Sequence, residues 1–323
     1  MAKPKVVLTR RWPQACEETA TELFDATLNA DDRPLSAAEL MEALSAADAL
    51  FSTVTDKVTA EVMSAEPLRA KLLGNFGVGY NNIDVDAAKQ LGLVVTNTPE
   101  VLTDCTADIA MTLLLTVARR TSEGERQLRA REWTGWRPTH MLGTKVTGKT
   151  LGILGFGRIG RAVARRAHHG FRMKVIYHDP YPPPEAEVKA VGGEPRDSVE
   201  AVLAEADFVS VHCPALPETR HLINAERLKM MKPGAFLINT ARGDVVDEAA
   251  LAEALKAGTI AGAGLDVYER EPEVTEALLS LENAALLPHL GSASQETRVA
   301  MGMKVIENAK AFFAGDAPPN RVA

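Results

Sequence analysis

The stretch Thr150-Leu-Gly-Ile-Leu-Gly-Phe-Gly-Arg-Ile-Gly160 decides the fold of this chain. Its first half, Thr150–Leu154, is typical of a buried strand, and a G-x-G-x-x-G pattern and a helical segment follow at once. Between a strand and a helix, such glycines allow a tight turn, close approach of the backbone to a pyrophosphate and close packing of the helix. We therefore predict a dinucleotide-binding turn formed by Gly155, Gly157, Arg158, Ile159 and Gly160.

An acid stands where the ribose of such a cofactor binds. The next expected strand, Lys174–Tyr177, leads to Asp179, nineteen residues after Gly160, and a carboxylate at this spacing accepts hydrogen bonds from ribose hydroxyls. A 2′-phosphate beside Asp179 would make a like-charge contact. The segment Pro180–Pro184 contains no arginine to offset it. The sequence therefore favours NAD(H) over NADP(H).

Short β-rich runs alternate with helical segments along nearly the whole chain, which is the signature of parallel sheets with crossover helices. We predict an α/β fold with two doubly wound parallel sheets, the first of five strands and the second, Rossmann-type, of six. The expected strands of the first sheet are Lys5–Thr9, Ala26–Asn29, Ala49–Thr53, Leu72–Asn75 and Leu93–Asn97. Those of the second are Thr150–Leu154, Lys174–Tyr177, Phe208–His212, Ala235–Asn239, Ala263–Val267 and Ala284–Leu287.

Capping signals mark two of the expected helices. Ser36 and Glu39 form a capping box, and Asp247 caps a helix that Gly258 ends. Longer helical runs extend from Thr106 to about Arg131, between the two series of strands, and from Gln295 to about Ala314, after the last strand.

The last helical run decides the domain organisation. Because the second sheet is complete at Leu287, we expect this run to return to the first domain. The substrate domain is then flavodoxin-like and discontinuous, 1–99 and 289–323, and 100–288 form an inserted NAD-binding Rossmann domain. We expect the ligand to bind between the two.

Composition and charge exclude several classes of protein. The 323 residues suffice for about two domains. A net charge of −7 does not favour binding to nucleic acid or to anionic lipid. The apolar stretch Ile109–Ala118 is about half as long as a bilayer requires. The N-terminal residues lack the apolar core of a signal peptide, so we expect a cytoplasmic protein. Three scattered cysteines and the lack of metal-ligand spacings predict neither disulfides nor a metal site.

Three loops at expected strand ends carry a cation, an acid and an imidazole. They are Thr240-Ala-Arg242-Gly, Asp266-Val-Tyr-Glu-Arg-Glu271 and Pro288-His289-Leu-Gly291. Reduction of a 2-oxo acid needs a guanidinium to hold the carboxylate and carbonyl oxygens, an imidazolium to protonate the forming alkoxide, and a carboxylate to orient that imidazole. Each residue alone also fits a surface charge or a helix cap, so the prediction depends on the three together.

These loops and several others resemble the D-isomer-specific 2-hydroxyacid dehydrogenases, in particular their glyoxylate/hydroxypyruvate reductase branch. The resemblance spans essentially the full length and implies the discontinuous first domain. It also implies an enzyme that reduces a small 2-oxo acid, glyoxylate or hydroxypyruvate, to the D-2-hydroxy acid with a nicotinamide cofactor. The stretches that carry it are Gly77–Asp84, Asn97–Asp108, Gly155–Gly160, Asn239–Gly243, Leu265–Glu271 and Pro288–Ser292.

The resemblance further implies roles for single residues. His289 is the expected acid/base, Glu271 is its partner, and Arg242 binds and polarises the substrate. Backbone N–H groups of Val78 and Gly79 are expected to hold the substrate carboxylate, at a glycine-rich strand end where a ligand can approach the backbone closely.

The rest of the implied site surrounds the cofactor and the subunit contact. Thr106 is expected near the pyrophosphate and Asp266 near the nicotinamide amide. The long bridging region is implied to form a homodimer interface, with Trp136 reaching the substrate site of the neighbouring subunit. The expected cofactor contacts, besides the glycine loop and Asp179, are Thr106, His212, Cys213, Pro214, Thr240, Ala241, Asp266 and Gly291.

One departure from the branch bears on the substrate. Members that prefer NADPH lack an acid at the position of Asp179, so this chain combines the branch's Trp136 segment with an NAD-type loop. Alternatives within the family are other 2-oxo acids or donors such as phosphite and formate, although formate enzymes lack a partner of the Glu271 type. An alternative of another class is an NAD-sensing binding protein, like the transcriptional corepressors that resemble these dehydrogenases.

Overall fold

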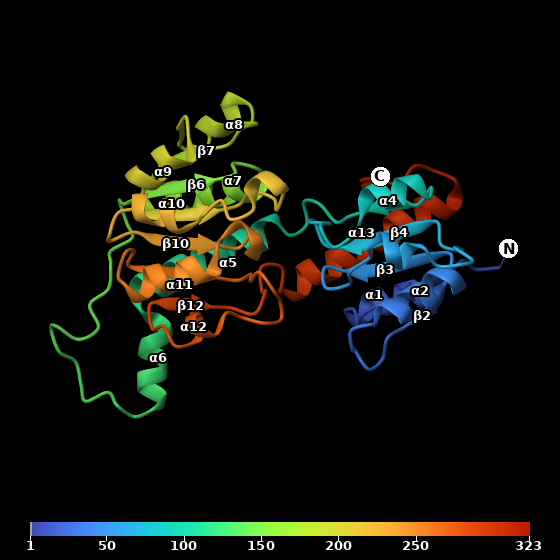
Figure 1. Ribbon diagram of the computed structural model, residues 1–323, viewed down its shortest axis with the longest axis horizontal. Coiled ribbons are helices and arrows are strands. Elements are labelled where there is room, and N and C mark those ends of the chain that lie inside the picture. The colour runs from blue at the N-terminus through green and yellow to red at the C-terminus, as the bar shows by residue number, and fades with distance from the viewer. Residues whose placement is uncertain (1) are drawn as a thin grey trace. The chain divides into compact units, whose positions relative to one another are not determined.

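The computed structural model describes residues 2–323, and they form two compact units. One unit takes the chain as far as Leu102 and resumes over Ala293–Ala323, and the other is Thr103–Ser292. Each is built on one parallel sheet with helices around it (Figure 1). The predicted fold class is confirmed. The boundaries at 102/103 and 292/293 compare with 99/100 and 288/289 expected from the sequence.

The first unit contains a five-stranded sheet of order β2-β1-β3-β4-β5, which is the flavodoxin-type order. All four neighbouring pairs are parallel. Its strands are β1 (Lys5–Leu8), β2 (Asp25–Thr27), β3 (Ala49–Thr53), β4 (Leu72–Phe76) and β5 (Val94–Thr96). Its helices are α1 (Gln14–Leu23), α2 (Ala37–Ala46), α3 (Ala60–Met63), α4 (Val85–Gln90) and α13 (Gln295–Ala314).

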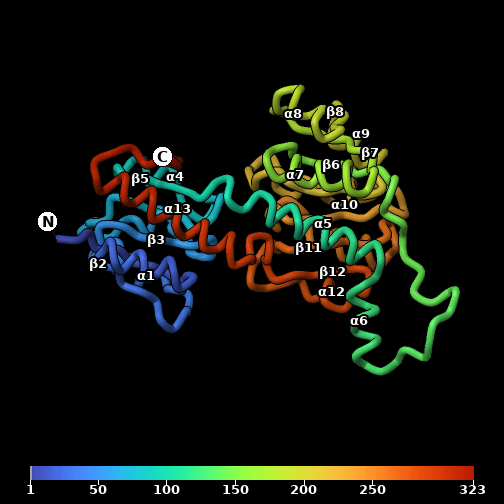
Figure 2. Tube along the Cα trace, turned by 180° about the vertical axis from the view of Figure 1, so that it is seen from behind, coloured from blue at the N-terminus to red at the C-terminus, as the bar shows by residue number. Residues whose placement is uncertain are grey.

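The two faces of this sheet are covered by different helices. On one face, α2, α3 and α4 bury a core that includes Leu44, Leu73 and Val95, and the predicted capping box at the start of α2 is present. On the other face, α13 lies on β4 and beside α1 (Figure 2). A Cβ at Gly74 would lie 2.7 Å from Val305 Cγ1, so glycine is what allows α13 to approach the strand.

The second unit contains a seven-stranded parallel sheet of order β12-β11-β10-β9-β6-β7-β8. After β8 the chain crosses to β9 on the other side of β6, so the switch point of the sheet lies between β6 and β9. The strands are β6 (Thr150–Leu154), β7 (Lys174–His178), β8 (Gly193–Pro195), β9 (Phe208–Val211), β10 (Phe236–Asn239), β11 (Gly262–Leu265) and β12 (Ala284–Leu286).

Six of these strands lie where the sequence predicts them, but the prediction of a six-stranded sheet is wrong. The additional strand, β8, is the three-residue edge segment Gly193-Glu-Pro195, which among residues 2–323 pairs only with β7. It has no apolar pattern because it lies at the edge of the sheet, where neither face needs to be buried.

The helices of the second unit also differ in one place from expectation. The helical run expected over Thr106 to Arg131 begins three residues earlier and is broken at Arg120, whose φ is 55°. Asp247 caps α11 as predicted. The helices are α5 (Thr103–Arg119), α6 (Thr121–Arg129), α7 (Arg158–Arg165, continued by a π-helical turn over Arg166–Gly170), α8 (Glu185–Lys189), α9 (Val199–Glu205), α10 (Ala225–Met230), α11 (Glu248–Lys256) and α12 (Glu276–Leu279).

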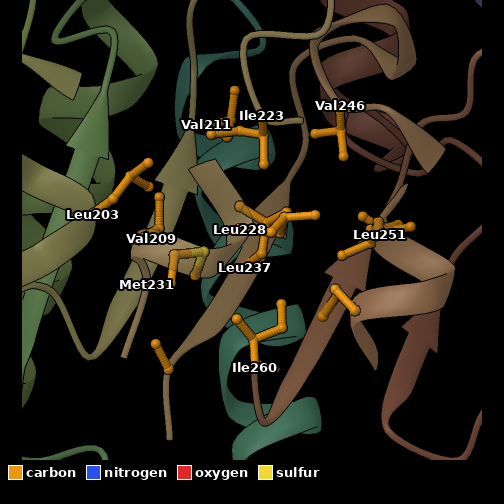
Figure 3. Packing of buried hydrophobic residues seen from close by; sticks show 14 of the residues in the cluster. Leu203, Val209, Val211, Ile223, Leu228, Met231, Leu237, Val246, Leu251 and Ile260 are labelled. Atoms are coloured by element: carbon orange, nitrogen blue, oxygen red, sulfur yellow. The ribbon is translucent and has the colours of Figure 1, made fainter. Parts of the chain in front are cut away.

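Two apolar cores sandwich this sheet. Leu113, Leu151 and Val163 belong to the core under α5 and α7. The opposite core, under α9, α10 and α11, includes Val209 and Leu237 (Figure 3). Burial on both faces fixes the strands, so the loops at their carboxyl ends have a rigid base. None of the helices between residues 2 and 323 is long and apolar enough to cross a membrane.

Candidate active site

The glycine loop lies at the switch point of the second sheet, and its three glycines meet different surroundings. A Cβ at Gly155, where φ is +90°, would lie 2.5 Å from the backbone N of Cys213 in the loop after β9. A Cβ at Gly160 would lie 2.3 Å from the Gly155 carbonyl oxygen. At Gly157, by contrast, no described atom lies within 4 Å of that position. Gly157 is exposed and begins α7 without a side-chain cap, so a ligand can reach this backbone and the helix N-terminus.

Asp179 is fixed beside this loop at the end of β7. Its Oδ2 accepts the N–H of Phe156 at 2.6 Å, and its Oδ1 accepts the N–H of Tyr181 at 2.8 Å. Phe156 is buried and stacks on Tyr177 with ring centroids 4.0 Å apart. The carboxylate is therefore held in place, and each oxygen keeps acceptor capacity for a further donor such as a ribose hydroxyl.

The loop after β9 contributes groups that are neutral near pH 7. The Nε2 of His212 lies 2.8 Å from Ser210 Oγ, and burial lowers the pKa of His212 to about 4. Burial raises the pKa of the Cys213 thiol to about 11. Cys213 is thus a protonated thiol and not a nucleophile at neutral pH. Pro214 follows on the surface.

Thr106, Asp266 and Gly291 come together although they belong to three different segments. A Cβ at Gly291 would lie 3.2 Å from Asp266 Oδ2 and 3.6 Å from Thr106 Oγ1. The buried Asp266 carboxylate accepts the N–H groups of Leu290 at 2.6 Å and Gly291 at 2.7 Å. Burial raises the pKa of Asp266, and those two N–H groups act against the rise. Asp266 therefore holds the loop that carries His289.

The structure brings His289 and Glu271 into contact. His289 Nδ1 lies 2.7 Å from Glu271 Oε2, and the two side chains are 32% and 28% exposed, so a substrate can reach them. The backbone of His289 is left-handed, with a φ of 55°, a conformation that non-glycine residues rarely adopt. The bonds from the two following N–H groups to Asp266 hold it there. Such strain is typical of functional sites.

Glu271 is held in its ionised form. Burial alone would raise the pKa of Glu271, but the hydrogen bond and charge of His289, the N–H of Tyr268 at 3.0 Å and the charge of Arg242 together lower it. In return, the charge of Glu271 opposes the lowering of the Arg242 pKa that burial causes. The guanidinium and the carboxylate are thus electrostatic neighbours.

The turn that carries Arg242 packs directly on the loop that carries Glu271. Arg242 follows β10, and its carbonyl oxygen accepts Asn239 Nδ2 at 2.9 Å. A Cβ at Gly243 would lie 1.9 Å from the carbonyl carbon of Tyr268, so only glycine permits this contact between backbones. The loops of Arg242, Glu271 and His289 are therefore assembled at one edge of the sheet, the carboxyl ends of β10, β11 and β12.

The residues present fit a nicotinamide dinucleotide. Thr240 follows β10 and is buried, and within residues 2–323 its Oγ1 has no hydrogen-bond partner. Buried hydroxyls are normally bonded, so a bound group is expected to complete it. The open position at Gly157 and the fixed carboxylate of Asp179 suit a pyrophosphate and a ribose. Ala241 lies between Thr240 and Arg242 and is partly buried.

The remaining predicted residues lie elsewhere. Val78 and Gly79 follow β4 in the first unit and are partly exposed. Trp136 is 83% exposed. It belongs to the segment 130–149, which has neither helix nor strand and stands away from the second sheet beside α6 (Figures 1 and 2). Within residues 2–323 no group of three His, Cys, Asp or Glu side chains could hold a metal ion.

Two residues that support the site, Tyr268 and Glu248, were not predicted from the sequence. Tyr268 donates its N–H to Glu271, and its hydroxyl donates to the carbonyl oxygen of Leu287 at 2.9 Å, so it joins the two loops. Glu248 is buried, and its carboxylate accepts the N–H of Glu269, two residues before Glu271. An acid in the first turn of a helix is normally explained by the helix dipole. The sequence therefore gives no sign that Glu248 also contacts the loop of Glu271.

Comparisons with known proteins agree with this geometry. Residues 111–291 match the family model described as D-isomer specific 2-hydroxyacid dehydrogenase, NAD binding domain. The chain is 48% identical to a glyoxylate reductase of Thermococcus litoralis, over 99% of this chain and 97% of that relative. It is 46% identical to a glyoxylate reductase of Pyrococcus furiosus, over 99% of this chain and 95% of that relative.

Solved structures give the same result. A glyoxylate reductase from Paecilomyes thermophila superposes with a TM-score of 0.88 at 34% identity, over 100% of this chain and 99% of that one. The NADPH-dependent glyoxylate/hydroxypyruvate reductase of Sinorhizobium meliloti, solved with NADP and malonate, gives 0.89 at 37% identity, over 100% and 97%. Because the similarity extends over nearly the whole chain and the family match includes the glycine loop and all three charged loops, the chain belongs to the D-isomer specific 2-hydroxyacid dehydrogenases, which use a nicotinamide cofactor.

Proposed function

We propose that this protein reduces glyoxylate or hydroxypyruvate to the D-2-hydroxy acid, with NADH preferred over NADPH. The observation that carries the proposal is the 2.7 Å contact between His289 and Glu271, beside the Arg242 turn at the edge of the Rossmann sheet. The relatives named glyoxylate reductase support the choice of substrate.

The residues of the chain have separate tasks in this reaction. A bound NADH supplies the hydride that reduces C2 of the oxo acid. His289 Nδ1–H donates to the ionised Glu271, so the Nε2–H of the imidazolium is the group that protonates the carbonyl oxygen as it becomes an alkoxide. Arg242 binds the carboxylate and carbonyl oxygens, polarises the carbonyl and presents one face of C2. The N–H groups of Val78 and Gly79 bind the substrate carboxylate.

Asp179 supports the preference for NADH. Two backbone N–H groups fix its carboxylate at the end of β7, so it cannot turn away from a 2′-phosphate without losing both bonds. A phosphate there would meet a like charge. The Sinorhizobium meliloti reductase is named NADPH-dependent, so the proposed preference for NADH rests on Asp179 and not on the fold.

We also propose that the protein is a homodimer. Leu128, Trp133, Trp136 and Leu142 are 59%, 52%, 83% and 67% exposed, and all four belong to α6 or the segment 130–149. Such a concentration of exposed apolar side chains is typical of an interface. A cytoplasmic location stays a prediction.

The test of the reaction is loss of NADH or NADPH absorbance with glyoxylate, hydroxypyruvate and pyruvate, and gain of NADH with phosphite or formate. We expect turnover of glyoxylate or hydroxypyruvate and a higher kcat/KM with NADH. Asp179→Ala should shift the ratio of the two kcat/KM values toward NADPH by about tenfold or more, since a like-charge contact costs several kcal/mol and about 1.4 kcal/mol already corresponds to tenfold. A wild-type preference for NADPH would show that Asp179 is wrongly assigned, and no turnover of any 2-oxo acid would favour the NAD-sensing alternative.

A further inference from the structure

We infer that Asn75 and Asn97 are positioning residues for the substrate carboxylate. They fix the peptide planes of the loop Gly77–Gly79, so that the N–H groups of Val78 and Gly79 are turned outward and kept available for an anion. This inference rests on the proposed function, which gives those two N–H groups their ligand.

Each carbonyl oxygen of this three-residue loop is held from inside the first unit. Asn75 Nδ2 donates to Gly77 O at 3.2 Å and to Gly79 O at 2.9 Å. Asn97 Nδ2 donates to Val78 O at 2.8 Å. Gly77 O also accepts the backbone N–H of Thr98 at 3.0 Å. Two side-chain amides and one backbone N–H thus hold three consecutive carbonyl oxygens, and Val78 O depends on Asn97.

A carbonyl oxygen that is held in place also fixes the direction of the N–H group in the same peptide. In a trans peptide, the C=O of one residue and the N–H of the next lie in one plane and point in opposite directions. Holding Gly77 O inward therefore turns the N–H of Val78 outward, and holding Val78 O does the same for Gly79. Between residues 2 and 323, neither of these N–H groups donates to a carbonyl or side chain.

The two amides are themselves fixed. Asn75 is fully buried in β4, and its Oδ1 accepts Asn82 Nδ2 at 3.3 Å, which sets the orientation of the amide. Asn82 Nδ2 also donates to Thr53 O at 3.0 Å, at the end of the neighbouring strand β3. A Cβ at Gly77 would lie 2.7 Å from Val54 Cγ1, so the start of the loop packs too closely on Val54 for a side chain. The arrangement is ready before a ligand binds, which lowers the cost of binding.

The main test is Asn97→Ala, because Asn97 is only partly buried. We expect KM for glyoxylate and Kd for oxamate, measured calorimetrically with NADH present, each to rise about tenfold, the upper range for one hydrogen bond. KM for NADH and Tm should stay near wild type. The matched control is Asn283→Ala, which removes another partly buried amide that holds a backbone carbonyl, Leu255 O at 3.1 Å, and should leave KM and Kd unchanged.

Asn75→Ala leaves Gly77 O bonded to the N–H of Thr98 at 3.0 Å, so we expect it to raise KM and the oxamate Kd less than Asn97→Ala does, if the variant folds. Unchanged KM and oxamate Kd in Asn97→Ala would overturn the inference, and so would a loss of kcat alone, which indicates a merely structural role. Oxamate binding does not depend on turnover. A wild-type enzyme that binds oxamate but reduces no 2-oxo acid would therefore refute the proposed function and leave the positioning role to be decided by the Asn97→Ala binding ratio.

Discussion

At the scale of single residues, the candidate site depends on one imidazole in an uncommon backbone conformation. We expect His289→Asn to lower kcat by a factor of about 10²–10⁴, the usual worth of a general acid, with little change in the Kd of NADH. Asparagine is the informative substitution because it tolerates the left-handed conformation, which His289 adopts at a φ of 55°. The fold should therefore survive, as a thermal melt would show. Near-normal turnover of glyoxylate by this variant would end the assignment of His289.

The sequence contains the identity of these candidates but not their contacts. Arg242, Glu271 and His289 can be named because each stands in a loop after a recognisable strand. That Glu271 and His289 meet depends on β11 and β12 being neighbours in the sheet, which only the strand order decides. The sequence also does not show that the two N–H groups after His289 donate to Asp266.

At the scale of the element, different glycines of the glycine loop are expected to serve cofactor binding and helix packing. Gly157→Ala should fold like wild type, because its φ of −67° suits alanine and no described atom lies within 4 Å of the added Cβ. The new methyl group would occupy the open side where the pyrophosphate is expected, so we expect the Kd of NADH, measured by fluorescence titration, to rise about tenfold or more.

The matched substitution Gly160→Ala should do the opposite. Its Cβ would lie 2.3 Å from Gly155 O, so α7 must shift, and we expect a loss of roughly 1–3 kcal/mol of unfolding free energy, the usual penalty of overpacking. Chemical denaturation of both variants measures the contrast. Wild-type NADH affinity in a well-folded Gly157→Ala protein would contradict the assignment of the loop to a cofactor.

Elements were predictable from the sequence where burial imposes a pattern on it. The central strands are mainly apolar because helices cover both faces of each sheet, and the caps Ser36 and Asp247 mark helix starts through their side-chain chemistry. The edge strand β8 buries little and so leaves no such mark. The break between α5 and α6 is not visible in the sequence either, because its left-handed residue is Arg120 and not a glycine.

At the scale of the whole molecule, the second unit presents apolar surface that its own core does not use. The segment 130–149 follows α6, which an ion pair between Arg126 and Glu282 ties to the loop before β12. We expect a particle of about 69 kDa, twice the 34.7 kDa of one chain, in sedimentation or light scattering. Leu142→Asp should convert it to monomers because it places a charge within the proposed interface.

The control for this prediction uses the same substitution at a comparable exposure. Leu279 in α12 is 56% exposed, against 67% for Leu142, but lies outside α6 and the segment 130–149, so Leu279→Asp should remain a dimer. If Trp136 completes the neighbouring substrate site, the Leu142→Asp monomer should bind NADH normally, yet show a KM for glyoxylate raised about tenfold, as loss of one aromatic contact implies. A monomeric wild type would refute the proposed dimer. A Leu142→Asp monomer with an unchanged KM for glyoxylate would agree with the dimer but refute the role of Trp136 in the neighbouring substrate site.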